Sequence, residues 1–173
     1  MADVGLKRGT VQVVPYNPEW AKSFEEEKSK LQKAFSGRLL SIEHVGSTAV
    51  PGLAAKPLID MMAAIPALSQ YHEYVEELHK FGYEYMPGRV FDDRVFFPKG
   101  PRSKRTHHLN LVEVGSEQWH TTLNFRDYLR DHADKRKEYQ ELKENLAKLY
   151  PNNCEAYTKA KNQFIQDVLT NIA

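Results

Sequence analysis

Apolar residues recur at helical spacing near the start of the chain, then in short blocks typical of strands, and then at helical spacing again. One face of the first predicted helix carries Trp20, Phe24, Leu31 and Phe35. Asn17 and Pro18 suit the N-cap and first helical position, and Gly37 ends the segment. A second helix is predicted between a capping Ser69 and Gly82.

Short apolar runs predict strands around these helices. A lead-in strand is predicted in the first fifteen residues, with its apolar positions at 11–14, and the other predicted strands span residues 39–45, 56–65, 83–86, 94–97 and 107–114. Residues 46–52, which include Gly46 and Pro51, form a tight connection between the strands at 39–45 and 56–65.

The pattern becomes helical after Gly115, where Ser116 can cap a helix that runs to about residue 131. The next helix stops at Pro151, and Asn152 with Glu155 resembles a capping box for the last one. The apolar face of the middle helix is expected in the core, and the lysines and glutamates between its positions are expected in solvent. Its apolar positions are Tyr139, Leu142, Leu146 and Leu149. The fold class is therefore α+β, with a mixed β-sheet, a helical layer and C-terminal helices.

The composition fits one domain over residues 1–173, because 41% apolar and 27% charged residues are typical of a globular chain. The net charge of +1 provides no global field for nucleic acid or an anionic membrane. No apolar window approaches the ~20 residues of a membrane span, and the single Cys154 allows no internal disulfide. We expect a cytoplasmic protein without a membrane partner, and the oligomeric state stays open.

The stretch with chemical potential is HVGSTAVPGL at residues 44–53, followed by KPLID at 56–60. Gly46 lets the backbone approach a ligand closely, and Ser47 and Thr48 offer hydroxyl and amide groups to an anion. Strand alternation puts Lys56, Asp60 and Met62 on one face. Because an isolated buried carboxylate is costly, Asp60 needs a partner, a metal or a cleft.

Each of these residues also has a structural interpretation. Asp60 can be a strand-end aspartate that binds loop amides, and Ser47 can be a simple turn or helix cap. A lone Gly-Ser pair does not decide between these interpretations and a ligand site.

Residues 44–53 and 56–60 resemble the signature of the GrpB family, and FRDYLR at 125–130 resembles a second block of that family. GrpB proteins are similar to the nucleotidyltransferase superfamily, in which Gly-Ser precedes a short helix and an Asp-x-Asp pair holds divalent metal. The resemblance implies a nucleotidyltransferase-like fold, metal at Asp60, and a nucleotide or other phosphorylated ligand. A related domain fused to dephospho-coenzyme-A kinases implies adenine nucleotides or coenzyme A. Asp60-Met61-Met62 supplies one carboxylate where active superfamily members carry two.

Other candidates line the expected cleft. The predicted catalytic and metal residue is Asp60. The predicted ligand-binding residues are Gly46, Ser47, Thr48, His44, Lys56, His108 and Arg126. His108 shares a strand face with Asn110, and a hydrogen-bonded structural histidine is the alternative to a metal role. Arg126 can hold a phosphate or form an Arg–Asp network between helix and sheet. Glu113 is a further candidate carboxylate, with a solvated strand end as its alternative.

Three functions remain open from the sequence. The first is an Mg²⁺-dependent enzyme that transfers a nucleotidyl or phosphoryl group. The second is a module that binds nucleotides or coenzyme A compounds without catalysis, and the third is a partner-binding scaffold. The single carboxylate leaves Mg²⁺ weakly bound unless a phosphorylated ligand completes its shell.

Overall fold

A four-stranded mixed sheet with the order β1-β2-β4-β3 forms the centre of the protein in a computed structural model that describes residues 4–172. The strands are β1 (Ser41–Val45), β2 (Ile59–Ile65), β3 (Val95–Lys99) and β4 (His107–Glu113). β2 lies antiparallel to β1 and parallel to β4, and β3 lies antiparallel to β4. The predicted mixed sheet is confirmed.

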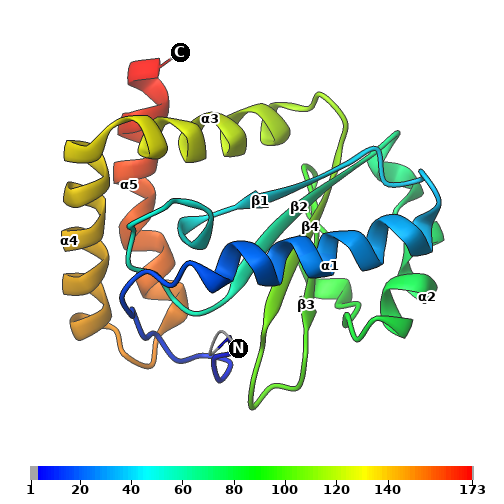
Figure 1. The fold of residues 1–173 in the computed structure, drawn as a ribbon, viewed down its shortest axis with the longest axis horizontal. Helices are drawn as coiled ribbons and strands as arrows, with labels where there is room; N and C mark the ends of the chain where they lie inside the picture. Colours follow the sequence, from blue (N-terminus) through cyan, green and yellow to red (C-terminus); the bar gives the residue numbers. More distant parts are fainter. Residues whose placement is uncertain (1–3, 173) are drawn as a thin grey trace.

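Five α-helices surround the sheet: α1 (Glu19–Phe35), α2 (His72–Lys80), α3 (Glu117–Asp131), α4 (Ala133–Leu149) and α5 (Cys154–Ile172). α1 crosses one face of the sheet, and α4 and α5 stand beside one another at its side, with α3 near their upper end (Figure 1). Among residues 4–172, no helix is long and apolar enough to cross a bilayer.

Alternation along the strands assigns the two sheet faces different environments. Met61, Leu109 and Phe97 belong to the main core under α1 and α2. On the opposite face, Met62 and Val112 pack with Trp119 and Leu123 of α3. Asp60 and His108 are directly paired in register and lie on this second face. The sheet therefore presents its polar residues toward α3 and α5.

Local signals predicted the start of α3, but the prediction that Ser69 caps α2 is wrong, because Ser69 lies within the short helix η2 (Leu68–Gln70) and α2 begins at His72. The Ser116 side chain accepts a hydrogen bond from the Trp119 amide at 3.3 Å and caps α3 as expected. α5 begins one residue later than the Asn152 prediction, because the side chain of Asn153 accepts from the Ala156 amide at 3.0 Å.

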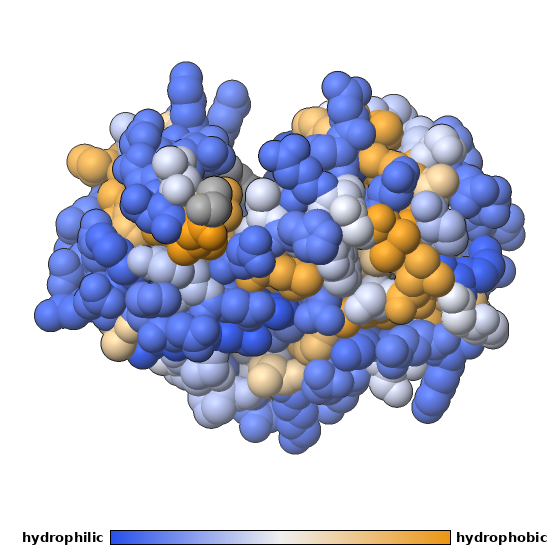
Figure 2. Space-filling model, turned by 90° about the horizontal axis from the view of Figure 1, so that it is seen from above, coloured by the Kyte–Doolittle hydropathy of each residue, from blue (hydrophilic) through white to orange (hydrophobic). Residues whose placement is uncertain are grey.

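Two predicted strands are wrong. The lead-in segment contributes only isolated bridges, from Leu6 to Arg105 and from Val14 to Ala55, and its residues 1–3 lie outside the described residues. Residues 83–86 contribute a single bridge from Tyr83 to Lys99. Neither segment has a continuous partner strand, so neither forms a ladder. From the upper side of Figure 1, the surface is mostly hydrophilic and is hollowed by a notch between two lobes (Figure 2).

Candidate functional site

The turn between β1 and β2 folds its backbone directly onto Asp60. Gly46 has φ 69° and ψ −171°, a conformation that is essentially restricted to glycine. A β-carbon at this position would lie 2.7 Å from Oδ2 of Asp60. The short helix η1 (Ser47–Ala49) follows, as predicted. Glycine is therefore required both by the backbone angle and by the approach to the carboxylate.

A cavity of about 500 Å³ opens beside this turn, between the sheet, α3, α4 and α5. Ser47, Lys56 and Asp60 all line it, so the predicted common cleft is present. Its apolar wall comes mainly from α3 and α5 and includes Phe125, Leu129, Ile165 and Leu169.

Two lysines from the C-terminal helices reach the same cavity. Nζ of Lys143 on α4 donates to Oγ of Ser47 at 2.9 Å and also to the carbonyl of Ala54. The Lys143 side chain is almost fully buried, and burial together with the charge of Lys161 holds its pKa well below the ordinary value. Burial and the charge of Lys56 lower the pKa of Lys161 to about 8, against the opposing effect of Asp60.

The lining of the cavity is strongly unbalanced in charge. Within the described part of the chain, its basic residues are Lys56, Arg94, Arg126, Lys143 and Lys161, and its single carboxylate is Asp60. Arg94 pairs with Asp93 outside the lining. Among the ion pairs within residues 4–172, none involves Lys56, Lys143 or Lys161, although Lys56 and Lys161 both lie over the ring of Tyr157. Three lysines therefore face the cavity without a carboxylate at ion-pair distance, and Asp60 is the one acid whose charge acts on both Lys161 and Lys143.

Asp60 is held ionised by its neighbours. Burial raises the pKa of its carboxyl, but the hydrogen bond from His108 and the charges of His108, Lys56 and Lys161 outweigh burial and lower it. Nδ1 of His108 lies 3.3 Å from Oδ1 of Asp60. The structural interpretation of Asp60, an aspartate that binds only loop amides, therefore does not describe its surroundings, because a histidine and two lysines act on this carboxylate.

His44 lies away from the cavity, unlike the other predicted ligand residues of the turn. Its ring stacks on Phe24 of α1 with centroids 4.8 Å apart, and its Nε2 lies 2.9 Å from the Thr48 hydroxyl. Burial and the charges of Arg130 and Arg126 lower the pKa of His44 to about 4, although Asp60 opposes the shift. A neutral, packed imidazole orders the turn instead of contacting an anion, while Thr48 still lines the cavity.

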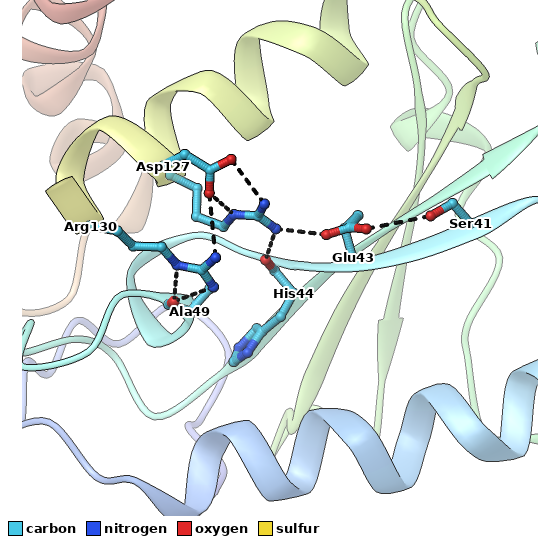
Figure 3. A network of polar contacts seen from close by, with 7 residues as sticks. Ser41, Glu43, His44, Ala49, Asp127 and Arg130 are labelled. Atoms are coloured by element: carbon cyan, nitrogen blue, oxygen red, sulfur yellow. Dashed lines mark hydrogen bonds and ion pairs between the residues drawn. The ribbon is translucent and has the colours of Figure 1, made fainter.

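Arg126 occupies the edge of the cavity but is engaged within the protein. Its guanidinium donates to Glu43 at 2.8 Å, to the His44 carbonyl at 2.9 Å and to Asp127 at 2.8 Å. Arg130, one turn later, donates to the Ala49 carbonyl (Figure 3). These bonds tie α3 to both sides of the turn, so the geometry favours the structural network for Arg126.

No second carboxylate stands beside Asp60 within the described part of the chain. Met62 occupies the next position on that face, and Glu43, its partner across the strands, is bound to Arg126. Glu113 lies at the other end of β4, where it accepts from the Leu68 amide. Among residues 4–172, no group of three or more acidic, histidine or cysteine side chains could hold a metal ion.

Lys143 and Lys161 were missed from the sequence, and the expectation that the lysines of the middle helix all face solvent is wrong for Lys143. A signal existed in the spacing. Lys143 follows Tyr139 by four positions, and Lys161 follows Tyr157 by four, so each lysine shares a face with a buried aromatic residue.

The model of the family described as GrpB protein matches residues 10–171. The chain belongs to the GrpB family. It is 34% identical to glutamate-rich protein GrpB of Alkalihalophilus pseudofirmus, over 96% of this chain and 98% of that protein. It is 36% identical to UPF0157 protein YqkA of Bacillus subtilis over 90% of this chain, but the match spans only 45% of YqkA. A dephospho-CoA kinase of Mycolicibacterium paratuberculosis is 26% identical over 94% of this chain and 46% of its own length.

Solved structures agree on the fold. The crystal structure of conserved protein GrpB from Enterococcus faecalis has a TM-score of 0.84 at 35% identity, covering 92% of this chain and 96% of that one. The Cid1 poly(U) polymerase bound to MgATP has a TM-score of 0.53 at 12% identity, covering 79% of this chain and 44% of that one. GrpB proteins thus share the nucleotidyltransferase-like fold, and the likeness to the polymerase concerns the fold alone.

Proposed function

We propose that the cavity beside Gly46 and Ser47 binds a phosphorylated small molecule, with an adenine nucleotide or a coenzyme A compound as the first candidates. The observation that carries this proposal is the set of three lysines without a carboxylate at ion-pair distance around one cavity. A desolvated cation without a counter-ion is costly, and an anionic ligand removes that cost. The lowered pKa values of Lys143 and Lys161 reflect the same crowding.

The lining of the cavity suits the two parts of such a ligand. Lys56, Lys161 and Ser47 line the cavity, and all three can donate to phosphate oxygens. Phe125 and Ile165 belong to the apolar wall of α3 and α5, which offers a surface for a ring system. A volume of about 500 Å³ falls within the range of small-molecule sites. The relative named dephospho-CoA kinase supports testing coenzyme A compounds as well as nucleotides.

The donor set is a poor fit to Mg²⁺ on its own. Mg²⁺ is usually bound by one or two carboxylates together with substrate phosphates. Here Asp60 is the only acid at the cavity, Lys56 and Lys161 add positive charge beside it, and the thioether of Met62 is a poor Mg²⁺ ligand. Any divalent ion at Asp60 therefore depends on the phosphates of the ligand to complete its shell.

This donor set makes binding the primary proposal and transfer of a nucleotidyl or phosphoryl group the second. The fold and the placement of Asp60 next to Gly46-Ser47 favour the second candidate, and the single carboxylate favours the first. A partner-binding scaffold finds less support. The large exposed apolar side chains within residues 4–172 are Leu40, Val90, Phe91, Val114 and Leu149, and only Leu149 belongs to the helical back.

A thermal-shift screen tests the proposal. ATP and coenzyme A are added with and without Mg²⁺, to the wild type and to the Ser47→Ala variant. A ligand at 100 times its Kd adds ~2.7 kcal/mol of stability. We expect a shift without Mg²⁺ that is reduced in Ser47→Ala and unchanged in Lys159→Ala, an exposed control on α5. A thermal shift that appears only with Mg²⁺, or that is equally large in Ser47→Ala, would contradict the proposal.

A further inference from the structure

A second cavity, of about 450 Å³, lies on the same sheet face as the first. It is bounded by residues 6–10, by η3 (Pro87–Arg89), by Phe96 and Pro98 of β3, and by the first turns of α5. Nothing in the proposed function uses this cavity. The start of α5 separates the two spaces, since Thr158 lines the second cavity while Tyr157 and Lys161 line the first.

The second cavity also has a basic rim, although the hydrogen bond from Arg105 and the charge of Arg8 both help to lower the pKa of the Glu84 carboxyl. Lys7, Arg8 and Arg89 are exposed at its rim, and none of them takes part in an ion pair within residues 4–172. Arg105 also lines it, but this guanidinium is bound to Glu84 and to the Gly100 carbonyl. Among residues 4–172, the only carboxylate in the lining is that of the exposed Glu155.

An aromatic surface lies among these cations. The Arg89 guanidinium is 5.8 Å from the centroid of the Phe96 ring, and the His108 ring meets the Phe96 ring edge-on at 5.0 Å. Met86 and Pro98 extend the apolar part. A basic rim around an aromatic surface suits a molecule that combines an anionic group with a planar or apolar part.

The two cavities meet at three residues. Lys56 lines both of them. Asp60 lines the first, His108 lines the second, and the two side chains are 3.3 Å apart. A molecule in each cavity would therefore contact the same hydrogen-bonded pair from opposite sides.

We propose that the second cavity is a separate site for a phosphorylated compound with a planar or apolar part, and that it shares Lys56 with the first site. The second site is inferred from the residues that line the second cavity. Only the meeting of two ligands at Asp60 and His108 rests on the proposed function. Lys56 contacts both ligands in this arrangement, so its removal weakens both sites, whereas Arg8 and Arg89 serve the second site alone.

Amide NMR spectra recorded during titration with inorganic pyrophosphate test this proposal. We expect two groups of shifting signals, one including Ser47 and Asn162 and the other including Gly9 and Thr158. The double variant Arg8→Ala/Arg89→Ala should weaken the second group at least tenfold and spare the first. Lys161→Ala should do the reverse, and Lys56→Ala should weaken both.

Controls keep the two proposals distinguishable. Arg8 and Arg89 are exposed, so the double variant should fold, and Arg102→Ala removes a neighbouring exposed cation that lines neither cavity. A second group that is absent, or that the double variant leaves unchanged, would overturn the second site. Loss of the first group alone would refute the proposed function and leave the second site standing.

Discussion

Replacement of Lys143 by methionine tests whether this buried side chain is neutral in the folded protein. Lys143 is 1% exposed, and its amine is bonded to Ser47 and to the Ala54 carbonyl without a carboxylate partner. In the unfolded chain the amine binds a proton up to the ordinary pKa of 10.5, whereas burial lowers the pKa in the fold. Below pH 10.5 the unfolded state therefore holds more protons, and the free energy of unfolding of the wild type rises with pH.

The size of the effect follows from these two states. While the folded amine stays neutral, each pH unit below 10.5 costs the wild type about 1.4 kcal/mol. Methionine removes this cost but also removes two hydrogen bonds, worth about 1–2 kcal/mol each. Lys143→Met should therefore be less stable than the wild type near pH 10.5, where the loss of the hydrogen bonds dominates, and should gain on the wild type as the pH falls.

Urea unfolding of both proteins at several pH values between 7.5 and 10.5 measures this difference. The relative stability of Lys143→Met should fall by about 1.4 kcal/mol per pH unit. Lys148→Met, an exposed change on the same helix, should show no such slope. A constant difference between Lys143→Met and the wild type would show that Lys143 is charged in the fold, and would contradict the lowered pKa of its amine.

Three further predictions concern the turn and its surroundings. Gly46→Ala should lower the free energy of unfolding by about 1–3 kcal/mol because of its positive φ, and urea unfolding should detect this loss; stability equal to the wild type would show that the turn can relax. Arg126→Ala should destabilise by about 2–3 kcal/mol, because Glu43 and the His44 carbonyl lose a charged donor; an unchanged melting temperature would refute the structural network. Asp60→Asn should abolish any effect of Mg²⁺ on ATP affinity while the far-UV circular dichroism spectrum stays the same, and tight Mg²⁺ binding that persists in this variant would place the metal elsewhere.

Elements that depend on local sequence were the predictable part of the fold. Ser116 caps α3 through a bond to a residue three positions on, and such a bond is visible in the sequence. The predicted lead-in strand and the predicted strand at 83–86 failed for the opposite reason. Val14 meets Ala55 and Tyr83 meets Lys99 in single bridges, and whether a segment finds a full partner strand depends on distant residues.

The residues of the candidate site also fall into those that local sequence predicted and those that depend on distant packing. Gly46, Ser47 and Asp60 lie within fifteen positions of one another, so one motif contained them. Lys143 reaches Ser47 across 96 positions, and only the packing of α4 against the turn brings them together. The four-residue spacing from Tyr139 indicates the face of Lys143, but not which part of the protein that face contacts.

The central claim is most directly tested by counting the protons taken up when ATP binds. Titration calorimetry at pH 8, in two buffers with different ionisation enthalpies, gives the uptake and the Kd together. With a pKa of about 8, Lys161 is half protonated in the free protein, and a bound anion should complete its protonation, with an uptake of about half a proton from this residue. Lys161→Ala should lose that uptake and bind at least tenfold more weakly, while Lys159→Ala should behave as the wild type. ATP binding of equal affinity in Lys161→Ala, with no uptake in either protein, would contradict a phosphate site in this cavity.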